Sequence, residues 1–211
     1  MTMPIGRGSR SRGALLLADI SGYTSFLNGV AQAHQALLLE ADEPPPAYAA
    51  VSGLLDATLA AVEPTFRLAK FEGDAIFVVE RGPLPRGAAV LACIRACYGT
   101  FREQLALASA QWTCTCSGCI RIRDLDLKFV LHHGEYVVNR IAGQEELAGR
   151  DVIIVHRLLK NHARDLVGSR PYALLSDAAI EALDIPAEGM LAGLETYDDL
   201  PPVGVRVLAL A

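Results

Sequence analysis

A short apolar run near the start of the chain, ALLLADI at residues 14–20, constrains the fold more than any other feature. Runs of this length and composition are typical of a β-strand that is buried on both faces. Asp19 interrupts the run, and the polar segment SGYT follows it, so the strand ends there. We therefore expect a buried first strand that carries an acidic side chain at its C-terminal end.

Hydrophobic periodicity and turn signals divide the rest of the chain into helices and strands. Ser21 stands where the N-cap of a helix would lie, and this helix should run toward the EADEPPP break, whose prolines stop it. Glu72-Gly73 and His133-Gly134-Glu135 each separate two β-prone runs, so each predicts a hairpin. The remaining pattern predicts helices at 46–62, 87–108 and 149–162, a strand and then a short helix capped at Ser176, and terminal strands at 191–195 and 205–210. This order predicts an α+β fold in which helices pack on a mostly antiparallel sheet.

Composition narrows the possible functions. With 19 Lys and Arg against 24 Asp and Glu, the net charge is −5, which disfavours nucleic acid as a partner. The chain is 52% hydrophobic, yet no apolar run is long enough to span a membrane. We expect one globular domain over residues 13–211, preceded by a mobile basic tail at residues 1–12. Because Asp19 ends the first apolar run too early for a secretory signal, we also expect a cytoplasmic protein.

Asp19 lies at the C-terminal end of the first strand, and Asp74 lies just past the hairpin turn between the next two strands, so the two acidic groups could meet at adjacent strand ends. Such a pair would repel unless a cation lay between the carboxylates, and hard divalent cations such as Mg²⁺ are bound by one or two carboxylates together with substrate phosphates. The alternative is purely structural. Asp19 would then receive backbone N–H groups of the next helix, and Asp74 would complete a turn. Spacing alone leaves both interpretations open.

Four segments in series resemble a known family. LLLADISGYTSFL and LAKFEGDAIFVV are similar to the two metal-binding segments of class III nucleotidyl cyclases, the adenylate and guanylate cyclases. FVLHHGEYVV and ELAGRDVIIVHRLL resemble two later motifs of the same family. The resemblance covers nearly all of the chain from residue 13. It implies a ferredoxin-like βαββαβ core, ATP as the substrate, and 3′,5′-cyclic AMP and pyrophosphate as the products.

The resemblance also implies roles for residues in the first two segments. Asp19 and Asp74 would hold two Mg²⁺ or Mn²⁺ ions, which in two-metal sites lie about 3.5–4 Å apart. The backbone of Ile20, Ser21, Gly22, Tyr23 and Thr24 would bind phosphate oxygens through N–H groups that point out of a helix N-terminus.

Further roles fall on the other segments. Lys70 would read the base and favour adenine, with Glu146 in place of the family's aspartate, and Arg157 would stabilise charge on the phosphate during transfer. Glu146 is one departure from the family, and Ile153 is a second, because it stands where active cyclases have a ribose-orienting asparagine.

The family acts as head-to-tail dimers whose sites combine residues from both subunits, so the resemblance implies a homodimer. Ile153 leaves two functions open. The chain is either an adenylate cyclase-like enzyme, with weak turnover, or a degenerate cyclase-homology module that binds nucleotide or a partner in a regulatory role.

A cysteine cluster lies outside the family motifs. Cys114, Cys116 and Cys119 form a C-x-C-x-x-C array, which could chelate Zn²⁺ if Cys93, Cys97 or a histidine supplied a fourth ligand. The alternative is that they are ordinary buried thiols. A metal-responsive regulatory protein is therefore a third, weaker possibility.

Overall fold

A computed structural model describes residues 8–35, 46–83, 86–168 and 171–210. The helices and strands in chain order are β1 (Ser9–Ser21), α1 (Tyr23–Ala33), α3 (Pro46–Val62), β2 (Phe66–Glu72), β3 (Ala75–Glu80), α4 (Ala88–Gln111), the 3₁₀-helix η1 (Cys119–Asp124), β4 (Asp126–Ile141), β5 (Gln144–Ala148), α5 (Arg150–Arg157), α6 (Ala163–Val167), β6 (Tyr172–Ser176), α7 (Asp177–Ala182), β7 (Leu191–Tyr197) and β8 (Leu200–Ala209). No helix in these ranges has both the length and the apolar composition needed to cross a membrane.

The strands form one sheet in the order β2-β3-β1-β4-β6-β8-β7, with β5 paired to β4. All neighbouring strands are antiparallel except β4 and β6, which are parallel. The first four strands have the spatial order β4-β1-β3-β2, and β2 and β3 form a hairpin, so they build the expected ferredoxin-like core. The prediction of an α+β fold with a mostly antiparallel sheet is confirmed.

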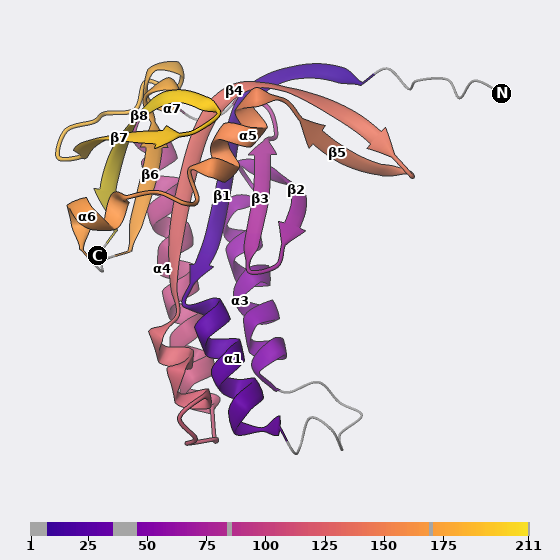
Figure 1. Cartoon of the computed structure of the whole chain (residues 1–211), viewed down its shortest axis with the longest axis vertical. Helices are drawn as coiled ribbons and strands as arrows, with labels where there is room; N and C mark the ends of the chain where they lie inside the picture. The colour runs from indigo at the N-terminus through magenta and orange to yellow at the C-terminus, as the bar shows by residue number, and fades with distance from the viewer. Residues whose placement is uncertain (1–7, 36–45, 84–85, 169–170, 211) are drawn as a thin grey trace.

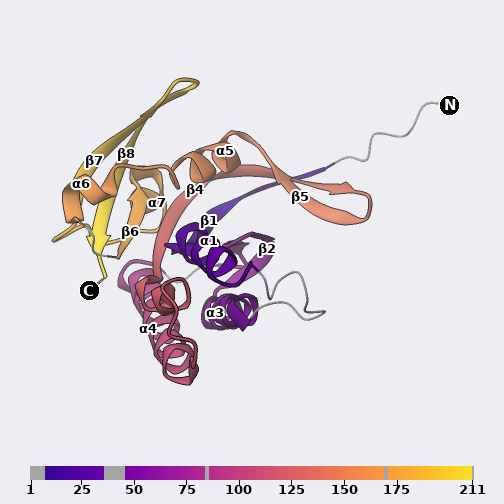
Figure 2. The same cartoon turned by 60° about the horizontal axis from the view of Figure 1, so that its bottom comes forward.

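Strand β1 lies inside this sheet and is buried on both faces, as its apolar run predicts. Because successive side chains of a strand point to opposite faces, Leu16 and Ala18 enter one hydrophobic core, and Leu15 and Leu17 enter the other. Helices α1, α3 and α4 cover the first face, and α5 and α6 lie over the second (Figures 1 and 2). The two cores hold the C-terminal end of β1 in a fixed position.

The helices at 46–62 and 88–111 agree with the sequence pattern, and the Ser176 Oγ accepts a hydrogen bond from Ala179 N, as expected of an N-cap. Helix α1 differs at both ends. Its N-cap is Gly22, because β1 continues through Ser21, and the predicted continuation of the helix over 36–41 lies outside the described residues. The predicted helix at 149–162 is also shorter, since α5 ends at Arg157.

The expected hairpin at 133–135 is wrong, because β4 continues without a turn from Asp126 to Ile141. The chain reverses instead at Ala142 and Gly143, which both have positive φ, and returns as β5. Gly134 has another physical role. A Cβ at this position would overlap the side chain of Asp151, so the glycine lets α5 approach β4.

The boundary expected for the basic tail is wrong for residues 9–12. Strand β1 begins at Ser9, and residues 9–12 pair with Val138–Glu135 of β4. Arg10 also forms an exposed ion pair with Glu135, at 2.7 Å. Residues 1–7 of the predicted tail lie outside the described part of the chain.

Candidate functional site

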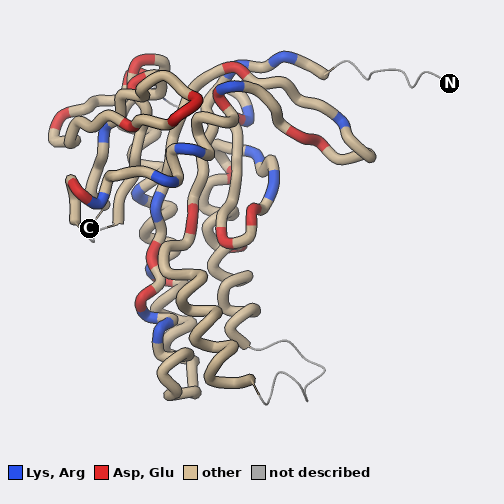
Figure 3. The backbone as a smooth tube through the Cα atoms, viewed as in Figure 1, with Lys and Arg blue, Asp and Glu red and all other residues tan. Residues whose placement is uncertain are grey.

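A polar cleft of about 520 Å³ lies where β1 ends and α1 begins. Asp19, Asp74 and the whole segment Ile20–Thr24 line it. Lys128 of β4 and the polar side chains of Lys160, Asn161 and Arg164 complete the wall. Acidic segments are visible at the end of β1 and at the β2–β3 turn, whereas α1 carries no charged side chain (Figure 3).

Strand pairing brings the two aspartates to the same place. Asp19 pairs with Ala75 in the β1–β3 register, and Ile20 N donates a hydrogen bond to Asp74 O at 3.0 Å. Burial, together with the negative charge of Asp19, raises the pKa of the Asp74 carboxyl above its ordinary value. Two carboxylates that repel each other in a half-buried cleft fit a divalent cation, because their oxygens are the hard ligands that Mg²⁺ and Mn²⁺ prefer.

Lys128 is a neighbour of these carboxylates that the sequence analysis missed. It lies opposite Asp19 in the β1–β4 register, and its Nζ is 3.3 Å from Asp19 Oδ1. Both side chains are largely buried, at 20% and 18% exposure. A signal was present, because Lys128 interrupts the apolar run of a strand in the same way as Lys70. The lysine supplies positive charge at the floor of the cleft.

The start of α1 offers backbone donors to the same cleft. Gly22 has a φ of 88°, a left-handed conformation that glycine adopts without strain, and no side chain caps the helix. Phe26 N bonds to Gly22 O, so the earlier N–H groups of the helix have no intrahelical acceptor. Free N–H groups at a helix N-terminus bind anions, and phosphate in particular. The segment predicted to bind phosphate therefore lines the cleft beside the aspartates. The prediction is wrong for the Ile20 N–H, which already donates to Asp74 O.

Lys70, by contrast, does not line this cleft. The β2–β3 register shifts between Leu68 and Lys70, which is a β-bulge. The bulge breaks the strand alternation, so Lys70 leaves the core face on which Phe66 is buried. Its Nζ lies 3.4 Å from Glu146 of β5 and 3.4 Å from Glu72. The structure thus brings the predicted base-reading pair, Lys70 and Glu146, into contact.

His156 of helix α5 contacts Glu72, the second acidic neighbour of Lys70. His156 Nε2 is 2.9 Å from each carboxylate oxygen of Glu72, and its Nδ1 lies 2.7 Å from Val152 O. The bond to Glu72 raises the pKa of His156. For Glu72, burial acts to raise the pKa, but the bond from His156 and the charges of His156 and Lys70 outweigh burial and lower it.

Arg157 is exposed on α5, where it lines a smaller pocket of about 310 Å³ with Val152, Ile153, His156 and Lys160. Ile153, the departure from the family pattern, is 53% exposed there. The predicted site residues therefore form two groups within one chain. Asp19, Asp74 and residues 20–24 line the cleft, whereas Lys70, Glu146 and Arg157 lie on β2, β5 and α5 outside it.

The three clustered cysteines lie together with His34, at the C-terminal end of α1. Cys93 and Cys97, two of the candidate fourth ligands, lie elsewhere: their sulfurs are 3.7 Å from Thr65 Oγ1 and 3.6 Å from Thr58 O. The hydrogen bond from Cys119 N to Cys116 Sγ contributes most to lowering the pKa of the Cys116 thiol to about 6. The histidine alternative is the one that the geometry favours.

Comparison with known sequences places the chain in a family. A family model described as a protein of unknown function, DUF2652, matches residues 51–165, which is more than half of the chain. The chain belongs to this family. A relative, the uncharacterized protein Rv2561/Rv2562 of Mycobacterium tuberculosis, is 37% identical to this chain over 123 residues. That match covers 56% of this chain and 53% of the relative, so the DUF2652 chain matches about half the length of that protein.

Solved structures of nucleotidyl cyclases have the same fold as the DUF2652 chain. The guanylyl cyclase Cya2 is similar over 97% of this chain and 100% of its own, with a TM-score of 0.66 and 17% identity. The adenylyl cyclase CyaB from P. aeruginosa is similar over 96% of each chain, with a TM-score of 0.62 and 16% identity. Adenylate cyclases from Trypanosoma brucei in their monomeric state are similar over 93% of this chain and 88% of theirs, with a TM-score of 0.54 and 16% identity. The chain therefore has the class III cyclase fold.

Proposed function

We propose that this DUF2652 chain binds ATP with two divalent cations and converts it slowly to 3′,5′-cyclic AMP and pyrophosphate. The observation that supports this most is the convergence of Asp19, Asp74 and the open N-terminus of α1 on one cleft. Carboxylates and free backbone N–H groups side by side suit a cation-bound triphosphate. The fold shared with adenylyl and guanylyl cyclases points to the same ligand class.

Each wall of the cleft would have its own task. Asp19 and Asp74 would hold two Mg²⁺ or Mn²⁺ ions, which when bound acidify the ribose 3′-hydroxyl and neutralise the triphosphate. The N–H groups of residues 23–25, which precede the first intrahelical bond of α1, would orient phosphate oxygens. Lys128 lines the same cleft and pairs with Asp19 at 3.3 Å in the free chain. With Asp19 binding a cation, the Lys128 ammonium group would be available to contact phosphate.

The second group of residues would complete the site from another subunit. Lys70 and Glu146 are 3.4 Å apart and 42% exposed each, so they offer a donor and an acceptor to an adenine edge. Arg157 is exposed nearby on α5. Because these residues lie outside the cleft of their own chain, we infer a head-to-tail homodimer in which each site combines the cleft of one subunit with Lys70, Glu146 and Arg157 of the other.

The reaction would be an internal phosphoryl transfer. The ribose 3′-oxygen attacks the α-phosphorus and forms the new O3′–P bond, while the bond from the α-phosphorus to the bridging oxygen of the β-phosphate breaks. Pyrophosphate leaves with the electron pair of that bond, and the 3′-hydroxyl proton passes to solvent. Arg157 would stabilise the charge that develops on the α-phosphate, a task suited to its planar set of donors.

The test is a cyclase assay on the purified chain with ATP or GTP and Mn²⁺, together with thermal melting in the same solutions. We expect cyclic AMP above the no-protein control and a higher melting temperature with ATP and Mn²⁺ than with either alone. The Asp74→Ala variant should lose both effects. Cyclic AMP formation that the variant retains would contradict the assignment of the cleft.

A second candidate function rests on Ile153. An exposed isoleucine on α5 cannot donate or accept a side-chain hydrogen bond at the position where active class III cyclases have a ribose-orienting asparagine. A degenerate module that binds ATP in a regulatory role would give the thermal shift with ATP and Mn²⁺ and no cyclic nucleotide. The two measurements above therefore distinguish the two functions.

A further inference from the structure

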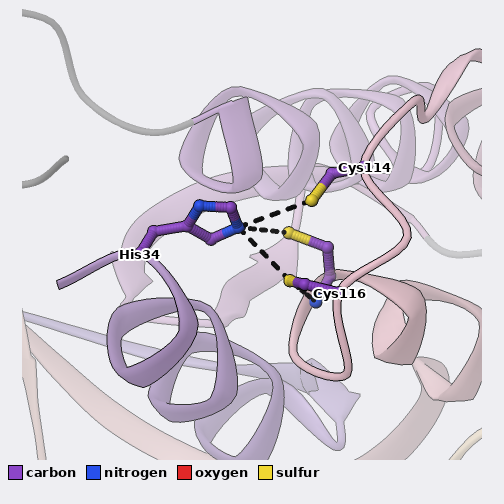
Figure 4. Close-up of side chains that lie close together, drawn as sticks. His34, Cys114 and Cys116 are labelled. Atoms are coloured by element: carbon purple, nitrogen blue, oxygen red, sulfur yellow. Dashed lines mark hydrogen bonds between the residues drawn. The ribbon is translucent and has the colours of Figure 1, made fainter. Parts of the chain in front are cut away.

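The side chains of His34, Cys114, Cys116 and Cys119 converge on one small volume between the end of α1 and the segment 114–119, which leads into η1. His34 Nε2 lies 3.2 Å from Cys119 Sγ, 3.3 Å from Cys116 Sγ and 3.5 Å from Cys114 Sγ. All four potential ligand atoms lie within 4.8 Å of one another. Figure 4 shows the imidazole of His34 pointing toward Cys114 and Cys116 from the end of α1.

Hydrogen bonding alone does not account for this geometry. An imidazole nitrogen carries either one proton or one lone pair, so Nε2 makes one good hydrogen bond at a time. Three sulfurs at nearly equal distances from that nitrogen need a different common partner. A cation at the centre of the four atoms would satisfy all of them together, because each ligand would direct a lone pair inward.

The distances match a tetrahedral zinc site. Zn–S bonds of about 2.3 Å and a Zn–N bond of about 2.0 Å, set at tetrahedral angles, place the nitrogen about 3.5 Å from each sulfur and the sulfurs about 3.8 Å from one another. The observed N···S distances of 3.2, 3.3 and 3.5 Å are close to that value. Four ligands around one point fit a single ion, whereas a [2Fe–2S] cluster divides its four ligands between two irons.

The fold builds this arrangement through a close backbone contact. A Cβ at Gly118 would overlap the backbone of Gly29 in α1, so the glycine allows the cysteine segment to lie directly against the helix. His34 lies five residues beyond Gly29, directly after the last residue of α1, and reaches the sulfurs. Trp112, just before the cysteines, packs edge-on against Phe26 of the same helix, with ring centroids 6.1 Å apart.

We propose that His34, Cys114, Cys116 and Cys119 bind one Zn²⁺ as a structural site that fastens the C-terminal end of α1 to the segment before η1 and to the first residue of η1. Three thiolates and an imidazole form a closed tetrahedral set, and neither the comparisons nor the cyclase-like motifs assign it. Zinc sites of this closed kind stabilise folds and leave no open position for substrate. The zinc proposal does not rest on the proposed cyclase activity, because none of its four residues lines the nucleotide cleft.

The zinc site would nevertheless fix one wall of the cleft. Helix α1 has 11 residues, with residues 23 and 24 at its start in the cleft and His34 just past its end at the cysteines. A helix of this length spans about 16 Å, and its fully buried residues are Phe26 and Val30, while Tyr23 and Leu27 pack against the core only partly buried. A metal clamp at the far end would therefore keep the N–H groups at the near end in position.

The experiment measures metal content on the full chain purified without chelators. We expect one Zn²⁺ per chain by elemental analysis. Zinc content should fall by roughly tenfold or more in Cys116→Ser and in His34→Ala, because each variant removes one ligand of four. Cys93→Ser is the matched control: it removes a cysteine outside the cluster and should retain full zinc content.

A second measurement covers the case in which a variant fails to fold. The wild-type chain is stripped of metal with a chelator and titrated with Co²⁺. We expect the strong thiolate-to-cobalt absorption and the visible bands of a tetrahedral site, saturating at one equivalent, with displacement by Zn²⁺. Iron in place of zinc, a Cys114–Cys116 disulfide that persists after purification under reducing conditions, or an octahedral Co²⁺ spectrum would each overturn the assignment.

Discussion

Lys128 and Asp19 face each other across the β1–β4 pair, with Nζ 3.3 Å from Oδ1, so the carboxylate of the proposed cation site already has a cationic partner in the free chain. A divalent cation must compete with this ammonium group. We expect Lys128→Met to raise the affinity for Mn²⁺ in the absence of nucleotide by roughly tenfold, because a unit charge about 4 Å away contributes at least about 1 kcal/mol even in water. Titration calorimetry or Mn²⁺ paramagnetic resonance would measure the change.

The control for Lys128 is Lys160→Met, which removes another positive charge from the lining of the cleft. Its effect on Mn²⁺ affinity should be clearly smaller. Equal effects of the two substitutions would indicate a general change in the potential of the cleft rather than competition at Asp19. A lower Mn²⁺ affinity in Lys128→Met would contradict the prediction outright.

Asp74→Asn should have opposite effects on ligand binding and on the stability of the ligand-free chain. Burial and the charge of Asp19 raise the pKa of Asp74, so its ionised form opposes folding at neutral pH, and this cost disappears as the pH falls and the group is protonated. The neutral amide should therefore raise the melting temperature of the ligand-free chain at pH 7–8 by roughly 1–4 °C. The extra stabilisation by ATP with Mn²⁺ should vanish. Thermal melting with and without ligands measures both, and a destabilised ligand-free variant would contradict the prediction.

The sequence placed Asp19 and Asp74 at neighbouring strand ends because the signals are local: Asp19 ends a buried apolar run, and Asp74 follows a hairpin glycine. Their metal role and the phosphate segment came from the family resemblance, and the residue pattern put the helix N-cap at Ser21, one residue before the observed Gly22. His34 could not be placed in this way. It is 80 residues from Cys114 along the chain, and only the packing of α1 against the segment before η1 brings the two together.

Two other features of the structure differ from the prediction because the same residue pattern fits more than one local structure. A glycine between β-prone runs predicts a turn, but Gly134 serves close approach to Asp151 instead, in a continuous strand. The β-bulge before Lys70 moves the Lys70 side chain to the other face of the sheet, and a prediction based on strict strand alternation does not include such a bulge. Both effects depend on a neighbouring element, so they become visible only in three dimensions.

Ile153→Asn tests whether one missing hydrogen bond limits turnover. The side chain is exposed beside Arg157, so the substitution needs no repacking of a core. A positioned hydrogen-bonding group in an active site contributes about 10²–10³ in rate, so we expect kcat to rise by at least roughly tenfold with little change in KM. Ile153→Ala is the control and should not raise kcat. Equal rates in all three proteins would place the limitation elsewhere.

The His156–Glu72 pair should make stability depend on pH. Both ring nitrogens of His156 face acceptors, Val152 O and Glu72, which favours the imidazolium and raises the His156 pKa. Its contribution is therefore fully present below the unfolded pKa of about 6.5 and is lost as the pH rises through the folded pKa. On the acid side, the same pair weakens as the pH falls through the lowered pKa of Glu72.

Melting curves of the wild type and His156→Gln across pH 5–9 would measure this dependence. The advantage of the wild type should be roughly 2–4 °C near pH 6 and should shrink as the pH rises above the folded pKa of His156. A direct NMR titration of His156 should give a pKa above its ordinary value. Parallel melting curves at all pH values would show that the pair adds no pH-dependent stability.

Mixed variants test the division of the site between two subunits. Asp74→Ala removes a cleft residue, and Arg157→Ala removes a residue of the second group, so each homodimer should be inactive. In a head-to-tail heterodimer of the two variants, one of the two sites receives its aspartates from the Arg157→Ala chain and its arginine from the Asp74→Ala chain. Random mixing makes half of the dimers heterodimers with one intact site each, so roughly a quarter of the wild-type cyclic AMP formation should return. Recovery that grows with protein concentration indicates a shared site, whereas no recovery in a mixture shown to contain heterodimers would mean that each chain forms its site alone.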